Sequence, residues 1–233
     1  MEAKKPSPLS VREQFMQQIE DRILSGQWKV GEKLPPARAL CDLYGVSLTV
    51  VNAGVSELVT RGFLTVRPRQ GTFVADYREN GSAETLMSLL RHNGGRLAPE
   101  DVRAFCETRI ALDPVVAELA IDRSSNEQFR QLGEKAEKVA GAENAEELCI
   151  AVTEFYHRLY QMSGNMIFSL LFHSTMEPQQ LMYRQFADKN GMTVLAEHVR
   201  AVYELLRDRD TEGAKRRILE DLQLPLKGST AII

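Results

Sequence analysis

The sequence predicts a mainly helical protein in two parts: three short helices that end in a β hairpin, followed by a longer, entirely helical bundle. Three observations support this. Apolar residues recur at helical spacing over most of the chain, and one compact pair of β-rich runs lies near residue 70. Beyond that pair, no strand-like alternation of useful length occurs. A length of 233 residues suits one large domain or two ordinary ones.

The first predicted helix, over residues 10–24, begins at a capping box. In this arrangement the Ser10 side chain accepts a backbone N–H bond from Glu13, and the glutamate reaches back to the serine. Val11, Phe15 and Ile19 follow at the spacing of one helix face.

Two further helices and a hairpin complete the first part. A short helix is expected over about 36–43, and a third begins after the N-cap Ser47 and ends near Arg61. Two β-rich runs, 63–66 and 71–74, surround a basic turn. This order of elements is that of a winged helix-turn-helix.

The remainder of the chain has a helical pattern throughout. We expect helices over 83–91, 99–121, 126–140, 145–162, 166–185, 193–207 and 211–222, which form an all-α bundle of six or seven helices. The predicted organisation is therefore a winged helix over 1–75, a polar linker over 76–82, the bundle over 83–225, and a C-terminal tail over 226–233.

Composition and charge limit the function classes. Hydrophobic residues make up 43% of the chain, and no apolar run approaches the roughly 18 residues of a membrane helix. We therefore expect no membrane partner. Three widely separated cysteines are typical of a reduced cytoplasmic protein. The net charge is −3, but up to residue 76 Lys and Arg outnumber Asp and Glu by two. A polyanionic partner is therefore expected to bind the first part.

The third helix has the character of a DNA recognition helix. Such a helix places its N-terminal turn in the major groove, where side chains reach base edges. Its outward residues are Ser47, Leu48, Thr49 and Asn52. Arg67 and Arg69 on the hairpin turn, and Arg38 on the second helix, are placed for phosphates. The alternative is a helical hairpin and ribbon that pack on something other than DNA.

The residues of this part resemble the GntR family of bacterial transcription regulators. The resemblance runs over about residues 10–75 and rests on the segments 23–35, 44–47, 62–64 and 70–74. It implies a winged helix that binds a double-stranded operator, commonly as a homodimer. The hairpin residues Gln70 and Gly71 join the expected DNA-contacting set.

Four residues depart from the family pattern. Leu48 and Asn52 stand where the family usually has arginines, and Ala37 replaces a glutamate. Gly54 lies inside the helix, at a cost of up to about 1 kcal/mol relative to alanine. Asn can pair with adenine and Leu can contact a thymine methyl group, so we expect an unusual operator. Fewer cations also predict weaker affinity and a flatter salt dependence.

In the bundle, Arg109 lies on an apolar helical stripe. Its companions at spacings of three and four are Val102, Phe105, Leu112, Val116 and Leu119. A buried arginine needs a partner. Either it meets an internal carboxylate, which the pattern alone favours, or it faces a cavity that receives an anionic ligand.

Other polar residues also lie on predicted inner faces. They are His157 with Thr153 one turn earlier, His198, and Asp221. Each alone is more often a satisfied core residue. Together, two histidines and an aspartate on separate helices could converge on a divalent metal.

Residues 83–222 resemble the FCD effector domain of FadR-subfamily regulators. The matching segments are 107–109, 112–114, 117–120, 155–159, 163–165, 197–198 and 209–214. The resemblance implies a dimerising domain that binds a small carboxylate and often holds a metal through one Asp and three His. The corresponding positions are Thr153, His157, His198 and Asp221, so Thr153 replaces the Asp and Asp221 replaces a His. With Arg109 they form the expected effector site.

We therefore expect a ligand-responsive transcription regulator, with a repressor favoured, that senses a small carboxylate. A divalent metal (Zn, Ni, Fe or Mn) is expected at His157, His198 and Asp221 if the altered ligand set still binds one. The alternatives are a metal-free regulator that senses an acyl-CoA, and a helical interaction protein with weakened DNA reading. The catalytic motifs of common enzyme families are absent from the sequence, so no enzyme is expected.

Overall fold

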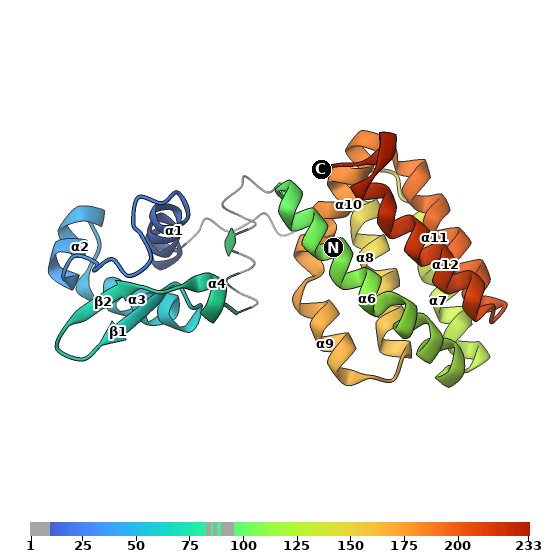
Figure 1. Ribbon diagram of the computed structural model, residues 1–233, viewed down its shortest axis with the longest axis horizontal. Helices are drawn as coiled ribbons and strands as arrows, with labels where there is room; N and C mark the ends of the chain where they lie inside the picture. The colour runs from blue at the N-terminus through green and yellow to red at the C-terminus, as the bar shows by residue number, and fades with distance from the viewer. Residues whose placement is uncertain (1–9, 83–84, 86–87, 90–95) are drawn as a thin grey trace. The chain divides into compact units, whose positions relative to one another are not determined.

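The computed structural model describes residues 10–82, 85, 88–89 and 96–233. The chain divides into two compact units, Met1–Gly94 and Gly95–Ile233 (Figure 1). The helix predicted over 83–91 lies mostly outside the described residues. Within the described residues no single helix is long and apolar enough to cross a membrane; only the bent pair Ala37–Tyr44 and Leu48–Thr60, taken together, passes on length and composition.

The first unit is a winged helix-turn-helix, as predicted. Its elements are α1 (Val11–Leu24), α2 (Ala37–Tyr44), α3 (Leu48–Thr60), β1 (Leu64–Arg67), β2 (Gly71–Val74) and α4 (Tyr77–Asn80). The capping box at Ser10 is present, with both reciprocal bonds to Glu13. The core of the unit draws on α1, α2, α3 and both strands, and includes Phe15, Ile19, Leu40, Leu58 and Phe63.

The hairpin is antiparallel, and the segment just before α2 pairs with its β2 strand. Leu64 pairs with Val74, and Arg67 pairs with Gly71. Lys33 forms an isolated bridge to Phe73, supported by a backbone bond of 2.9 Å from Leu34 N to Thr72 O. This short segment has no periodicity of its own in the sequence, and it holds the hairpin against the helical part of the unit.

Gly54 is required by the packing of α3 on α1. A Cβ atom at this position would lie 2.6 Å from Cδ1 of Phe15, closer than carbon atoms can approach. Helix propensity alone identifies Gly54 only as a weak helix former. In the structure it allows the Phe15 ring to lie directly against the backbone of α3.

Residues 76–82, predicted as a linker, include a helical turn that packs on the winged helix. The ring of Tyr77 lies 5.6 Å from that of Phe63, and the Thr85 hydroxyl donates to the carbonyl of Arg61. A Cβ on Gly62, whose φ is +78°, would lie 2.6 Å from the carbonyl oxygen of Asn80. The segment thus contacts the end of α3. The domain boundaries predicted from the sequence remain a prediction.

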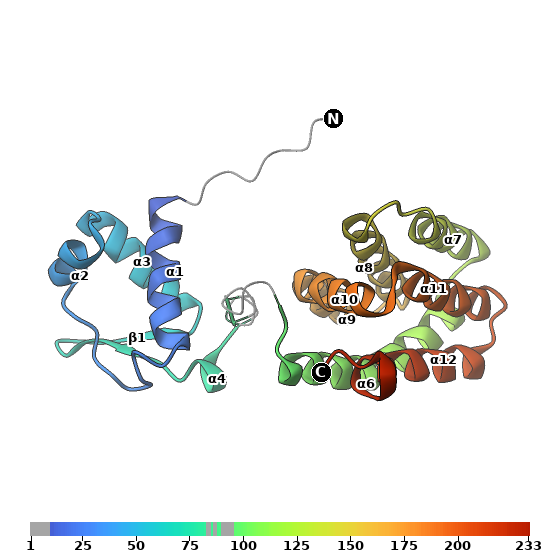
Figure 2. The same cartoon turned by 90° about the horizontal axis from the view of Figure 1, so that it is seen from above.

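The second unit is an all-α bundle, also as predicted. It contains α6 (Pro99–Arg123), α7 (Asn126–Ala140), α8 (Ala145–Met162), α9 (Met166–Ser174), α10 (Met176–Asn190), α11 (Met192–Arg207) and α12 (Thr211–Gln223). Helices α6 and α12 lie side by side, and α8 packs against α6, α7 and α10 (Figure 2). The buried faces of α6, α8, α10, α11 and α12 meet in the interior of the bundle.

The single helix predicted over 166–185 is in fact two helices. The chain leaves helical geometry at Thr175 (φ −114°, ψ 13°), which ends α9 and precedes α10. Pro178 lies in the first turn of α10, where its missing N–H costs nothing. Proline in that place indicates a helix start, and the apolar periodicity on both sides conceals it.

The C-terminal residues, predicted as a tail, fold back onto the bundle. They form two short 3-10 turns, η1 (Leu224–Leu226) and η2 (Gly228–Thr230). Asn190 of α10 donates to the carbonyl of Thr230 at 3.1 Å, and Ile232 N donates to the carbonyl of Pro225 at 2.9 Å. The segment therefore contributes to the wall of the second unit.

Candidate functional site

The N-terminal turn of α3 presents polar side chains to solvent. Gly45 adopts φ +65° at the turn before it, and Ser47 caps the helix by accepting a bond of 3.3 Å from Val50 N. Thr49 and Asn52 are exposed, and Leu48 is 46% exposed although it is apolar. The predicted recognition residues therefore share an accessible surface.

The hairpin turn carries two exposed arginines. The guanidinium of Arg67 lies 4.5 Å from the centre of the Phe73 ring, so the ring holds it by cation–π attraction. Arg69 adopts φ +61°, and Gln70 N donates to Arg67 O at 3.0 Å. Gly71 has φ +120°, and a Cβ there would lie 2.9 Å from Cε of Lys33. The turn is thus ordered by local contacts that leave the arginine heads accessible.

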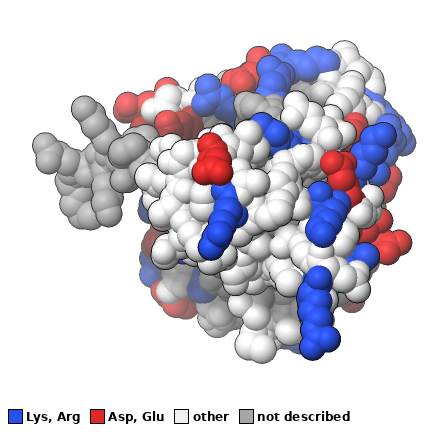
Figure 3. Space-filling view, turned by 90° about the vertical axis from the view of Figure 1, so that its left-hand side faces the viewer, with Lys and Arg blue, Asp and Glu red and all other residues white. Residues whose placement is uncertain are grey.

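The end of the first unit that carries α2 and the hairpin is the face shown in Figure 3. Lys and Arg side chains lie at separate places on a mostly uncharged face, and acidic side chains adjoin some of them. Arg38 is exposed on α2. Dispersed cations on a mostly uncharged surface suit a polyanion whose bases are read between phosphate contacts.

In the second unit, Arg109 is buried and fully paired. Its Nε and Nη2 atoms donate to Oδ2 of Asp113 at 2.9 and 2.6 Å, and Nη1 donates to the hydroxyl of Tyr183. Its guanidinium lies 4.3 Å from the centre of the Tyr156 ring. Of the two alternatives drawn from the sequence, the internal carboxylate is the one observed. The i, i+4 spacing of Asp113 was the signal available for it.

Three tyrosines surround this ion pair. Tyr160 donates to Oδ1 of Asp113 at 2.5 Å, while the rings of Tyr156 and Tyr183 stack with centres 6.3 Å apart. Burial raises the pKa of all three hydroxyls, so each is neutral near pH 7. Sequence reasoning missed all three as site residues, because tyrosine on a helix face is indistinguishable from ordinary core.

A small cavity of about 40 Å³ lies beside the ion pair, among α6, α8, α10, α11, α12 and η1. It brings together three of the five predicted effector residues, Arg109, His198 and Asp221. The other lining residues are aromatic or apolar: Tyr156, Met182, Tyr183, Phe186, Leu195, Leu222 and Pro225. Its present volume holds a few water molecules at most.

His198 and Asp221 form a second polar wall. Nδ1 of His198 lies 3.8 Å from Oδ1 of Asp221, and Nε of Arg217 lies 3.0 Å from the same carboxylate. Burial lowers the pKa of His198, although the Asp221 charge opposes that shift. Burial likewise raises the pKa of Asp221, against the attraction of His198 and Arg217.

The other two predicted residues do not line this cavity. Thr153 is buried, and its hydroxyl donates to the carbonyl of Cys149 at 2.7 Å. His157 stacks on Phe172 and lies with its ring centre 5.3 Å from that of His173. Because consecutive residues project about 100° apart on a helix, Tyr156 faces the cavity where His157 was expected.

The donor set does not fit a metal. His157 lies among Phe172 and His173, whereas His198 pairs with Asp221. Among the residues that the structure describes, no group of three His, Cys, Asp or Glu side chains could hold an ion. The Thr153 hydroxyl is already engaged by backbone. The metal expected at His157, His198 and Asp221 therefore has no site in this arrangement.

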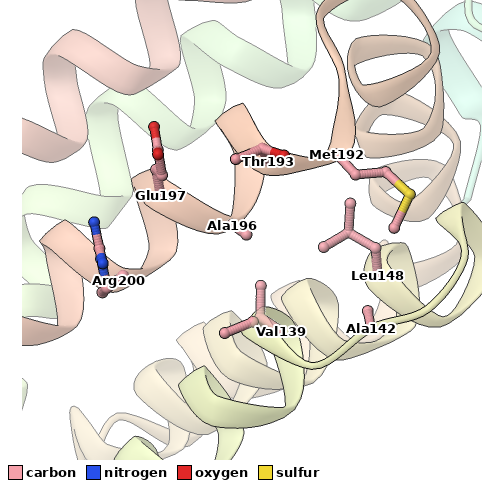
Figure 4. A pocket seen from close by; sticks show the side chains of 9 residues that line it. Val139, Ala142, Leu148, Met192, Thr193, Ala196, Glu197 and Arg200 are labelled. Carbon is pink, nitrogen blue, oxygen red and sulfur yellow. The ribbon is translucent and has the colours of Figure 1, made fainter.

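A wider surface groove of about 460 Å³ lies between α11 and the junction of α7 with α8. Figure 4 shows Val139, Leu148 and Ala196 projecting into the gap, whereas Glu197 and Arg200 lie farther along α11. None of the predicted site residues lines it.

Comparison with known proteins agrees with both units. Residues 11–74 match the model of "Bacterial regulatory proteins, gntR family", and residues 104–224 match that of the FCD domain. The HTH-type transcriptional regulator Mce2R of Mycobacterium tuberculosis is 30% identical over 165 residues, which cover 71% of this chain and 68% of the relative. YcbG of Bacillus subtilis, an uncharacterized HTH-type regulator, is 26% identical over 92% of this chain and 88% of its own length.

A solved structure supports the fold as well. The Listeria monocytogenes protein Lar, described as controlling the expression of the agr system, superimposes with a TM-score of 0.62 at 14% identity, over 93% of this chain and 96% of that one. The two family models together span most of the chain. The chain is therefore a DNA-binding transcription regulator of the gntR family that carries an FCD domain, and not an enzyme.

Proposed function

We propose that this regulator binds its operator as a homodimer and changes its DNA affinity when a small effector enters the cavity beside Arg109. One observation carries the proposal: polar groups from several helices converge on one cavity whose other lining residues are mostly apolar. Burying such groups costs stability unless it serves packing or a ligand. Because a cavity lies next to these polar groups, we favour ligand binding over packing as the reason for their burial.

DNA contact is assigned to the exposed surface of the first unit. Ser47, Leu48, Thr49 and Asn52 face bases in the major groove, whereas Arg38, Arg67 and Arg69 contact phosphates. Gln70 and Gly71 shape the hairpin turn that accompanies them. Two such surfaces in a homodimer read two half-sites whose spacing the dimer fixes.

The effector acts by shifting a population. A ligand that binds one arrangement of the bundle better than another favours that arrangement by its differential affinity. Binding of DNA and of ligand are then reciprocally linked. A repressor leaves its operator when the ligand binds.

Each effector class predicted from the sequence meets one obstacle in the cavity. A small carboxylate would have to compete with Asp113 for Arg109. An acyl-CoA is far larger than the present volume of about 40 Å³. Arg109, His198 and Asp221 nevertheless remain the polar contacts that the cavity offers.

The test uses the full chain and DNA from upstream of its own gene. We expect binding roughly 10³-fold tighter than to a scrambled duplex at the same salt concentration. Compounds that bind the cavity should change this affinity, and operator DNA should change theirs by the same factor. Equal affinity for the upstream and the scrambled DNA would contradict sequence-specific operator binding. Ligands that bind the cavity without changing the affinity for DNA would contradict only the proposed effector site.

A further inference from the structure

The charged groups around the Arg109 cavity compensate one another. The guanidinium of Arg109 is matched by the carboxylate of Asp113, with donor–acceptor distances of 2.6 and 2.9 Å. Asp221, which also lines the cavity, is matched by Arg217 at 3.0 Å. Of the remaining polar groups, His198 and the three tyrosines are neutral near pH 7. The charges of these two ion pairs therefore balance before any ligand arrives.

A charged ligand would upset this balance. An anion would place a second negative charge near Asp113 or Asp221. Its cationic partner among the described lining residues, Arg109, is already paired with Asp113. A cation would face the same difficulty near Asp221, which Arg217 already neutralises. Because the side chains of Arg109 and Asp113 are 5% and 0% exposed, an uncompensated charge beside them is costly.

The rest of the lining suits an apolar body. Phe186, Leu195 and Leu222 supply aliphatic and aromatic surface, with Met182 as an adaptable side chain between them. The hydrogen bonds of the described residues leave the Tyr156 hydroxyl unused, and this group lines the cavity. The site can thus exchange one or two neutral hydrogen bonds with a mostly apolar ligand.

We infer that the Arg109 cavity takes an uncharged, largely apolar ligand with a neutral hydrogen-bonding group, and not a carboxylate. The inference rests on the proposed function for the role of the site and narrows its ligand class. Arg109 and Asp113 act together as a neutral polar wall. Because the present volume is about 40 Å³, a ligand of this kind must displace lining side chains as it enters.

The test compares three probes of one shape and different charge: benzamide, benzoate and benzamidinium. Each is titrated into the full chain labelled at its methionine methyl groups, and the shift of the Met182 methyl resonance reports entry into the cavity. Met16, which is equally buried in the winged helix, is the control for non-specific effects. We expect saturable binding of benzamide that moves Met182 and not Met16, with the charged probes about tenfold weaker or worse.

Each outcome decides the question. If benzoate or benzamidinium binds as well as benzamide, the inference fails, although the cavity remains an effector site. If no probe moves Met182, the cavity is not a ligand site; the inference and the proposed effector site then fail together, while DNA binding is untouched.

A pair of variants tests the charge argument directly. Asp113→Asn leaves the Arg109 charge uncompensated, so benzoate should bind about tenfold tighter than to the wild-type protein. The double variant Arg109→Gln/Asp113→Asn restores neutrality and should lose that gain. Unchanged benzoate affinity in a folded Asp113→Asn protein would overturn the inference. If that variant does not fold, the comparison of the three probes on the wild-type chain still decides it.

Discussion

Arg109 and Asp113 share one face of α6, where their i, i+4 spacing joins two opposite charges in the interior. Tyr160 and Tyr183 complete the hydrogen bonds that the pair leaves open. A buried ion pair with its remaining sites satisfied adds little to stability, but loss of one partner is severe. The loss of stability depends on which charged residue is left buried without its partner.

Asp113→Ala should therefore destabilise the second unit by roughly 3–5 kcal/mol, because Arg109 keeps its charge in a site without a carboxylate. Denaturant unfolding followed through the tyrosines of the bundle measures this. Asp188→Ala, which breaks an exposed pair with Arg184, is the matched control, with an expected loss below about 1 kcal/mol. Similar losses for the two variants would contradict the assigned role of Asp113.

On the DNA-binding surface, substitutions of Asn52 and Arg69 should change the DNA affinity in different ways. Asn52→Ala should cost about 1–3 kcal/mol on the cognate operator and little on other sequences, since it removes a base contact. Arg69→Ala should weaken all sequences alike and flatten the plot of log affinity against log salt by about one unit. Binding titrations at several salt concentrations separate the two; an unchanged slope for Arg69→Ala would remove its phosphate role.

The elements themselves were largely predictable, and the failures have physical causes. Ser10 and Ser47 caps, helical periodicity and the β-rich runs placed α1, α3 and the hairpin within one or two residues. Periodicity could not show the break at Thr175, because apolar faces continue on both sides. It also could not show whether Tyr156 or His157 faces the cavity, because the rotation of α8 about its axis depends on how the helix packs.

The close approach of α1 and α3 gives a prediction opposite to helix propensity. Propensity alone says that Gly54→Ala stabilises α3 by up to about 1 kcal/mol. We expect a loss of about 1–3 kcal/mol instead, because the new methyl group collides with the Phe15 ring. Thermal unfolding of the first unit measures the effect.

Phe15→Leu supplies the control for this collision. In that background there is space for the methyl group, so Gly54→Ala should cost less than in the wild-type protein. Equal costs in the two backgrounds would show that Phe15 is not the obstacle.

The C-terminal segment gives a second prediction at the scale of elements. Pro225 lines the cavity, and so does Met182, whose Sδ lies 3.9 Å from Sγ of the buried Cys106. Removal of residues 224–233 should speed the labelling of Cys106 by a thiol reagent about tenfold or more, because the route through the cavity opens.

Cys149 is a built-in control for that experiment. Burial raises the pKa of both thiols to about 11, so their intrinsic reactivities match, but Cys149 does not line the cavity. Cys106 does not line it either, but it contacts the lining residue Met182. The labelling rate of Cys149 should stay constant after the truncation. If both cysteines react faster, the bundle has loosened as a whole and the local explanation is wrong.

At the scale of the whole molecule, charge is divided along the chain. The part up to residue 76 has a small positive balance, and the remainder has a negative balance of five. Nucleic acid is therefore directed to the winged helix, while the acidic FCD unit is repelled from phosphates. A small positive balance also means that one winged helix binds weakly.

Affinity should then depend on two linked contacts. An operator with one half-site destroyed should bind roughly 10²–10⁴-fold more weakly than the intact operator, because the second contact of a homodimer is intramolecular. Shifting one half-site by five base pairs, which turns it to the opposite face of the duplex, should cost as much. Gel-shift titrations with these duplexes measure both, and equal affinity for one half-site would exclude a dimeric reading mode.

The exposed Leu48 at the start of α3 has a consequence for epigenetic marks. An aliphatic side chain at a base edge detects a methyl group and little else. Thymine carries its methyl group on C5, and methylation of cytosine places one on the same ring atom. An operator read through Leu48 could therefore exchange a thymine for a methylated cytosine at that position with little loss of contact, so enzymatic methylation of DNA could create or extend binding sites for this regulator.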